Sequence, residues 1–176
     1  RTRELAGSDN IYTLGIRGVH DSKMLGANTL QEQKDALDQI LKAQREMISD
    51  IVNPDLEKVS QVFIPYKEVL DVYKTGLQVP EDVTLMWTDD NYGYIRHFPD
   101  SAEQTRKGGH GIYNHLSYWG RPHDYLWLAS THPALVYTQM KMAYDKGVRD
   151  MWIMNVGDIK PAEYLVVIMV APKGPG

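Results

Sequence analysis

The feature that most constrains this fold is the segment from Val83 to Gly93. Its first five residues are rich in strand formers, and they lead directly into two carboxylates, an amide, a tyrosine and a glycine. A buried parallel strand that delivers polar groups to the carboxyl edge of its sheet has this pattern. A second apolar run, residues 148–154, ends in the same way at Asn155 and Asp158. The two runs together predict an α/β fold with its functional site at that edge.

Composition limits the classes of function. The chain has 176 residues, 43% of them hydrophobic, which is enough for one domain with a substantial core. A net charge of −4 and the lack of a long apolar run favour neither nucleic acid nor membrane as a partner. The absence of cysteine excludes disulfides and thiolate catalysis. Because the chain starts at Arg1 without methionine, we interpret it as a piece of a longer polypeptide.

The hydrophobic pattern predicts strands joined by connections long enough for parallel pairing. The expected strands are 11–16, 83–88, 112–118 and 151–155. The first expected helix starts at Thr29, whose capping box includes Glu32, and further helices are expected from Leu56 to about Gly76 and over 133–146. A helix should also start at Pro161, but residues 165–170 read as a strand.

Asp89 and Asp90 are the expected catalytic carboxylates. On an extended strand only Asp89 shares the inward direction of Leu85 and Trp87, so Asp90 points to the helix side. Acid–base catalysis or hydroxyl binding, capping of a following helix, and chelation of a cation are the three roles open to this pair.

Other polar residues near the strand ends suit a charged sugar. Arg17 follows the first strand, and its guanidinium group can bind a substrate carboxylate through two N–H groups. The alternative role for Arg17 is an ordinary ion pair. Arg96 and Arg121 are the next candidates for binding the substrate carboxylate. His115 is either a satisfied core residue or a ligand contact, and Asp158 either binds substrate or caps a helix. The candidate substrate-binding residues are Arg17, His20, Asn91, Tyr92, His115, Asn155 and Asp158.

The motifs of several enzyme classes are missing from the sequence. No nucleophile elbow, dinucleotide loop or histidine pair at metal-ligand spacing occurs, so we expect neither a cofactor nor a metal. The chain has eleven tyrosines and four tryptophans but only two phenylalanines, a bias typical of wet clefts and carbohydrate-stacking surfaces. Carboxylates near such aromatics favour glycoside hydrolysis, in which two carboxyl groups flank the scissile bond.

Four blocks in fixed order, residues 12–18, 87–96, 111–120 and 152–161, give the chain a family resemblance. The sequence resembles glycoside hydrolase family 115, the xylan α-1,2-glucuronidases. The resemblance implies a large, multidomain, secreted or periplasmic enzyme with a central (β/α)8 barrel. The family removes glucuronic acid or its 4-O-methyl form from glucuronoxylan with inversion at the anomeric carbon.

On this reading residues 1–164 form a partial (β/α)8 barrel with about four parallel strands and outer helices, and residues 165–176 form an atypical tail. The resemblance makes Asp89 a catalytic-site carboxylate, with Asp90 as its alternate, and the second catalytic carboxyl is expected outside the chain. Exposed inner strand faces and sheet edges predict a homo-oligomer.

Two other classes of function remain open from the sequence. The chain is alternatively a carbohydrate-binding half-domain without turnover. It is alternatively an open-sheet protein of flavodoxin-like shape whose carboxylates bind Mg²⁺ and phosphate.

Overall fold

The computed structural model describes residues 4, 6, 8–19, 22–118, 120 and 126–171. The chain divides into two compact units, Arg1–Leu85 and Met86–Gly176. Each unit has its own buried apolar residues, among them Leu37 and Phe63 in the first and Trp87 and Ile112 in the second. Within the described part of the chain, no helix is long and apolar enough to cross a membrane.

Among the residues that the structure describes, five strands form one sheet in the order of the chain. They are β1 (Tyr12–Leu14), β2 (Gln61–Phe63), β3 (Thr84–Thr88), β4 (His110–His115) and β5 (Met151–Asn155). The pairs β1–β2, β2–β3 and β4–β5 are parallel. Each strand lies beside its predecessor in the chain, as in a (β/α)8 barrel and unlike the 2-1-3-4-5 order of a flavodoxin-like sheet. The predicted α/β class, a partial barrel of parallel strands with helices, is confirmed, with one strand more than expected.

In the first unit, the helix α2 (Leu30–Ile51) begins as its sequence predicts. The Glu32 amide donates to Thr29 Oγ1 at 3.1 Å, and the Thr29 amide donates to Glu32 Oε2 at 3.1 Å. This reciprocal capping box satisfies two backbone donors that the first turn would otherwise leave unpaired. The buried stripe of α2 is Leu37, Leu41 and Ile48.

The helix predicted from Leu56 to Gly76 is wrong. A 3₁₀ turn, η2 (Leu56–Lys58), is followed by strand β2 and then by the short helix α3 (Glu68–Lys74). The apolar residues between 59 and 73 fit a helical spacing, but Pro65 lies in their midst and would break a helix there. Gly76 does follow the helix end as predicted, with a φ of 94° that favours glycine.

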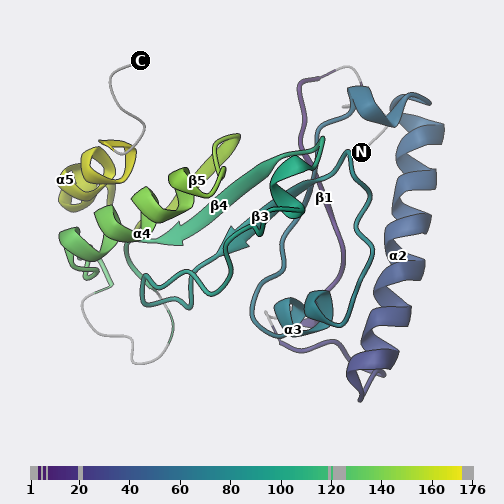
Figure 1. The fold of residues 1–176 in the computed structure, drawn as a ribbon, viewed down its shortest axis with the longest axis horizontal. Coiled ribbons are helices and arrows are strands. Elements are labelled where there is room, and N and C mark those ends of the chain that lie inside the picture. Colours follow the sequence, from purple (N-terminus) through teal and green to yellow (C-terminus); the bar gives the residue numbers. More distant parts are fainter. Residues whose placement is uncertain are drawn as a thin grey trace. The chain divides into compact units, whose positions relative to one another are not determined.

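The second unit contains β4, β5 and the helices α4 (Pro133–Asp145) and α5 (Ile159–Val170), which pack against each other (Figure 1). The predicted α4 is confirmed, and β4 begins and ends earlier than the predicted 112–118. The strand-like reading of residues 165–170 is wrong, because these residues continue α5. Ala162, Leu165 and Met169 are buried at helical spacing, whereas the β-branched Val167 is exposed.

Candidate active site

The Asp89 carboxylate lies inside the second unit, just beyond the end of β3. Oδ1 accepts hydrogen bonds from the Asn91 amide at 2.8 Å and contacts His115 Nδ1 at 2.6 Å. Oδ2 accepts from Asn114 Nδ2 at 2.8 Å and from the His115 amide at 2.6 Å. The side chain of Asp89 is 0% exposed, so a carboxylate expected to meet substrate is instead enclosed by four nitrogen partners.

His115 is the last residue of β4, and a group of tyrosines surrounds its ring. The rings of Tyr113 and Tyr118 lie edge-on to it at centroid distances of 5.2 and 5.7 Å. Tyr118 in turn contacts Tyr92, which is 62% exposed. These aromatic rings connect the buried Asp89–His115 pair with the surface of the unit.

Asn155, at the end of β5, joins the same group of residues. Its Nδ2 donates to the hydroxyl of Tyr113 at 2.9 Å. The β4–β5 register also places Asn155 beside His115. The structure thus brings together Asp89, Asn91, His115 and Asn155, all of which the sequence singled out.

Asp90 has a different environment from its neighbour. Its Oδ1 accepts from the Tyr92 and Tyr94 amides at 3.0 and 3.2 Å, and its Oδ2 pairs with Arg96. The Asp90 carboxylate therefore organises the turn after β3. Asn91 in that turn has a φ of 74°, a backbone conformation that few residues other than glycine adopt.

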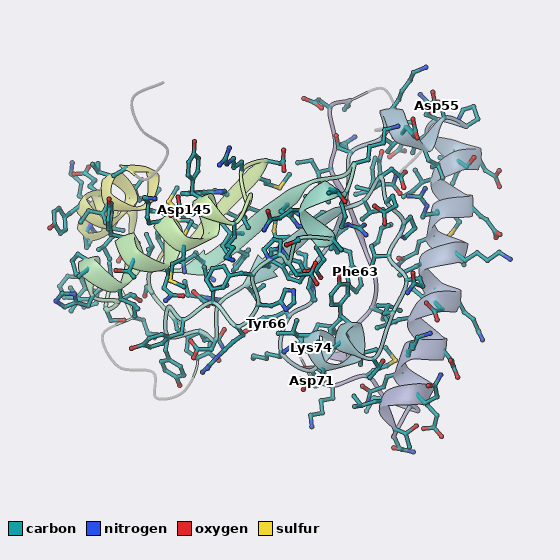
Figure 2. All side chains as sticks on the ribbon, in the orientation of Figure 1. Asp55, Phe63, Tyr66, Asp71, Lys74 and Asp145 are labelled. Carbon is teal, nitrogen blue, oxygen red and sulfur yellow. The ribbon has the colours of Figure 1, made fainter. Side chains whose placement is uncertain are left out.

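Arg17 and Glu68 form a bidentate pair within the first unit, after the ends of β1 and β2. Arg17 Nε donates to Oε1 at 3.1 Å and Nη2 donates to Oε2 at 3.0 Å. The Arg17 guanidinium and the Lys67 ammonium both lie over the ring of Tyr66, a residue labelled near α3 in Figure 2. The ion pair that the sequence left open for Arg17 is therefore present in the structure.

Glu68 is a candidate site residue that the sequence did not reveal. It was placed inside a predicted helix, whereas it is the first residue of α3, and its side chain is 17% exposed. Lys67 before it has a φ of 51°, a strained conformation of a kind that often occurs at functional sites. Pro65, a helix breaker, was the signal in the sequence that could have located this loop.

Of the remaining predicted residues, only Asp158 lies in the described part of the chain. Asp158 precedes α5 and is exposed, but its side chain makes no capping hydrogen bond. His20 lies outside the described residues, as does Arg121. No group of three potential metal ligands occurs among the residues that the structure describes.

A second histidine, His110, lies in a separate polar network at the start of β4. Trp87 Nε1 donates to His110 Nδ1 at 3.2 Å, and His110 Nε2 lies 2.7 Å from the Glu103 carbonyl oxygen. Burial is the main reason that the pKa of His110 is lower than usual. These contacts define a neutral imidazole with its proton on Nε2.

Comparison with known proteins places these features in a family. The model of glycosyl hydrolase family 115 matches residues 1–171. One similar solved structure is described as a family GH115 4-O-methyl-α-glucuronidase with specificity for decorated arabinogalactans. It is 61% identical to this chain and superposes with a TM-score of 0.90. The match covers 97% of this chain and 23% of the length of that structure. No curated protein sequence matches. The match along almost the whole chain shows that this chain belongs to glycosyl hydrolase family 115.

Proposed function

We propose that the polypeptide containing this chain hydrolyses the bond between a polysaccharide and an α-linked glucuronic acid or 4-O-methylglucuronic acid side group. The main support is membership of family 115 together with 61% identity to a 4-O-methyl-α-glucuronidase. The chain spans 23% of the length of that enzyme.

The side chains of both units fit this chemistry. In the second unit the exposed Tyr92 is linked through Tyr118 to the buried Asp89–His115 pair. Sugars stack on aromatic faces, while their hydroxyls need polar partners. In the first unit Arg17 and Glu68 form a bidentate pair, which sets a guanidinium charge that attracts the carboxylate of a uronic acid beside a carboxyl group.

Inversion requires two carboxyl groups roughly 6.5–9.5 Å apart, one donating a proton to the leaving oxygen and one activating water. Glu68 is partly exposed and lies beyond the end of a strand, so we propose it as one of these groups. Asp89 and Asp90 remain candidates for the site, but the burial of Asp89 favours an indirect role for it.

The polymer that carries the uronic acid is part of the proposal. The family resemblance alone favours glucuronoxylan. The 61% identical structure is described as specific for decorated arabinogalactans, so we propose a decorated arabinogalactan as the preferred substrate. Because such polymers lie outside cells, we also propose that the parent protein is secreted or periplasmic.

The test uses the full-length enzyme with glucuronoxylan and with arabinogalactan in separate reactions. We expect release of free glucuronic acid or its 4-O-methyl form, faster from arabinogalactan, as measured by anion-exchange chromatography. Release from xylan alone would reject the proposed polymer but keep the activity. No release from either polymer, by an enzyme that still binds glucuronic acid in calorimetry, would instead support a binding function without turnover.

A further inference from the structure

The side chain of Gln44 on α2 binds the backbone of Gly15, the residue that directly follows β1, at two points. The Gly15 amide donates to Gln44 Oε1 at 2.8 Å, and Gln44 Nε2 donates to the Gly15 carbonyl oxygen at 3.1 Å. The register of β1 and β2 ends one residue earlier, at Leu14 and Phe63. A side chain from α2 therefore becomes the partner of the backbone where the pairing of the two strands ends.

Gly15 has this partner at a point where the chain turns. Its φ of 108° lies in a region that favours glycine, and a Cβ at this position would lie 3.2 Å from Cε2 of Phe63. Because Phe63 is buried, the backbone passes close to the core here. A partly buried amide and carbonyl are destabilising unless both are hydrogen-bonded. The contact with Gln44 thus fixes the direction in which the chain leaves β1.

The helix that carries Gln44 is itself fixed in the first unit. Gln44 lies three residues after Leu41 and four before Ile48, so it shares the face of α2 that these two buried residues occupy. This face of α2 lies beside β1 (Figure 1). The carboxamide is therefore a rigid reference point for the Gly15 backbone.

Arg17 lies two residues beyond Gly15 and forms the bidentate pair with Glu68. Two residues of extended chain span at most roughly 7 Å, so the position of Gly15 limits where the Arg17 side chain starts. A guanidinium–carboxylate pair with two parallel hydrogen bonds also requires a defined mutual orientation. A change of chain direction at Gly15 would therefore break at least one of the two bonds and release Glu68 from its orientation.

We propose that Gln44 is a positioning residue that holds the end of β1 so that Arg17 keeps the Glu68 carboxyl group in its catalytic orientation. The inference rests on the proposed function, in which Glu68 is one of the two catalytic carboxyl groups. Both ends of the Gln44 carboxamide bind Gly15, so its effect passes through the backbone. The alternative is a purely stabilising role, in which loss of Gln44 lowers the free energy of unfolding but leaves kcat of the folded enzyme unchanged.

The first experiment compares Gln44→Met with Gln39→Met in the full-length enzyme. Methionine favours helices but has no N–H donor and only a weak acceptor. Gln39 is an exposed residue of the same helix and gives the matched control. At a temperature where both variants are folded, we expect Gln44→Met to lower kcat for release of glucuronic acid by on the order of tenfold or more, and Gln39→Met to leave it unchanged. A native kcat in folded Gln44→Met would overturn the proposal.

The second experiment does not depend on activity. Crystal structures of the native full-length enzyme and of Gln44→Met show whether the Arg17–Glu68 pair survives. Gln44→Glu keeps the acceptor for the Gly15 amide and replaces Gln44→Met in both experiments if the methionine variant does not fold. We expect two bonds between Arg17 and Glu68 in the native enzyme and the loss of at least one in the variant.

A variant that kept both bonds would overturn the proposal, whatever its kcat. If the variant lost the pair but the native enzyme released no uronic acid, Gln44 would still position the pair and the proposed function would be refuted. The two claims can therefore fail separately.

Discussion

The indole Nε1 of Trp87 donates a 3.2 Å hydrogen bond to Nδ1 of the buried His110. Protonation of Nδ1 would place a second N–H against that of the indole, so the contact opposes the charged imidazole. Burial acts in the same direction and lowers the pKa of His110.

Stability should therefore depend on pH through His110. The lowered folded pKa means that the unfolded chain binds the proton more readily, so stability falls as pH falls. The contribution of His110 should be complete above the ordinary histidine pKa of about 6.5 and be lost as pH falls through the lower folded pKa. Urea denaturation at a series of pH values above and below about 6.5 measures this change in the free energy of unfolding.

His110→Asn should weaken this pH dependence, because the amide does not titrate but can accept from Trp87. His132→Asn is the control, since His132 is exposed at the N-cap of α4 and asparagine also caps helices. If His110→Asn left the pH dependence of the unfolding free energy unchanged, His110 would not be its source.

Glu68→Gln in the full-length enzyme should lower kcat by about 10²-fold or more, because the amide keeps the shape of the side chain but cannot transfer a proton. Asp71→Asn, an exposed carboxylate on the same helix and labelled in Figure 2, should have little effect. A Glu68→Gln enzyme with native kcat would exclude Glu68 from the chemistry.

Asp90→Asn should mainly affect stability, because Asp90 accepts from two turn amides and pairs with Arg96. We expect a loss of about 1 kcal/mol, as for a lost capping carboxylate, with kcat nearly unchanged. Comparison with Asp89→Asn by steady-state kinetics and thermal unfolding checks this difference. If the Asp90→Asn enzyme lost turnover while the Asp89→Asn enzyme remained active, the roles assigned to both residues would be wrong.

Gly93→Ala should destabilise the second unit more than Gly76→Ala destabilises the first. Both glycines have positive φ, 93° and 94°, so each alanine suffers backbone strain. A Cβ on Gly93 would also lie 2.8 Å from Thr131 Cγ2, whereas nothing lies within 4 Å of a Cβ on Gly76. Equal losses in urea denaturation would mean that the Thr131 contact relaxes without cost.

The isolated 176-residue chain should self-associate. Large apolar side chains are exposed in each unit, including Ile11 and Leu25 in the first and Trp127 and Ile153 in the second. Exposed apolar patches and strand edges favour association. Light scattering should give a dimer or larger species, and a monomer with a cooperative thermal transition would contradict this.

The sequence predicted those elements whose local signals agree with their packing. The capping box at Thr29 and Glu32 located the start of α2, and the apolar run before Asp89 located β3. The sequence did not predict β2, because a strand of three residues is too short to show an alternation of apolar and polar side chains. It also misassigned the second half of α5, because the β-branched residues there favour a strand although the burial pattern is helical.

The candidate site shows the same division. Strand ends predicted that Asp89 and Asn155 would be functional candidates, whereas His115 was a candidate within an expected strand. These three residues lie in one connected group. Sequence could not reveal that Asp89 is fully enclosed, because that depends on donors from Asn114 and His115, 25 and 26 residues further along the chain. Glu68 was missed because its strand was missed.

We propose that this family 115 chain belongs to an inverting glucuronidase. Proton NMR during hydrolysis of an α-linked 4-O-methylglucuronic acid substrate by the full-length enzyme tests this proposal. Inversion predicts that the β-anomer of the free acid appears first and that the α-anomer follows only by mutarotation. Initial formation of the α-anomer, or the absence of any released acid, would contradict the account.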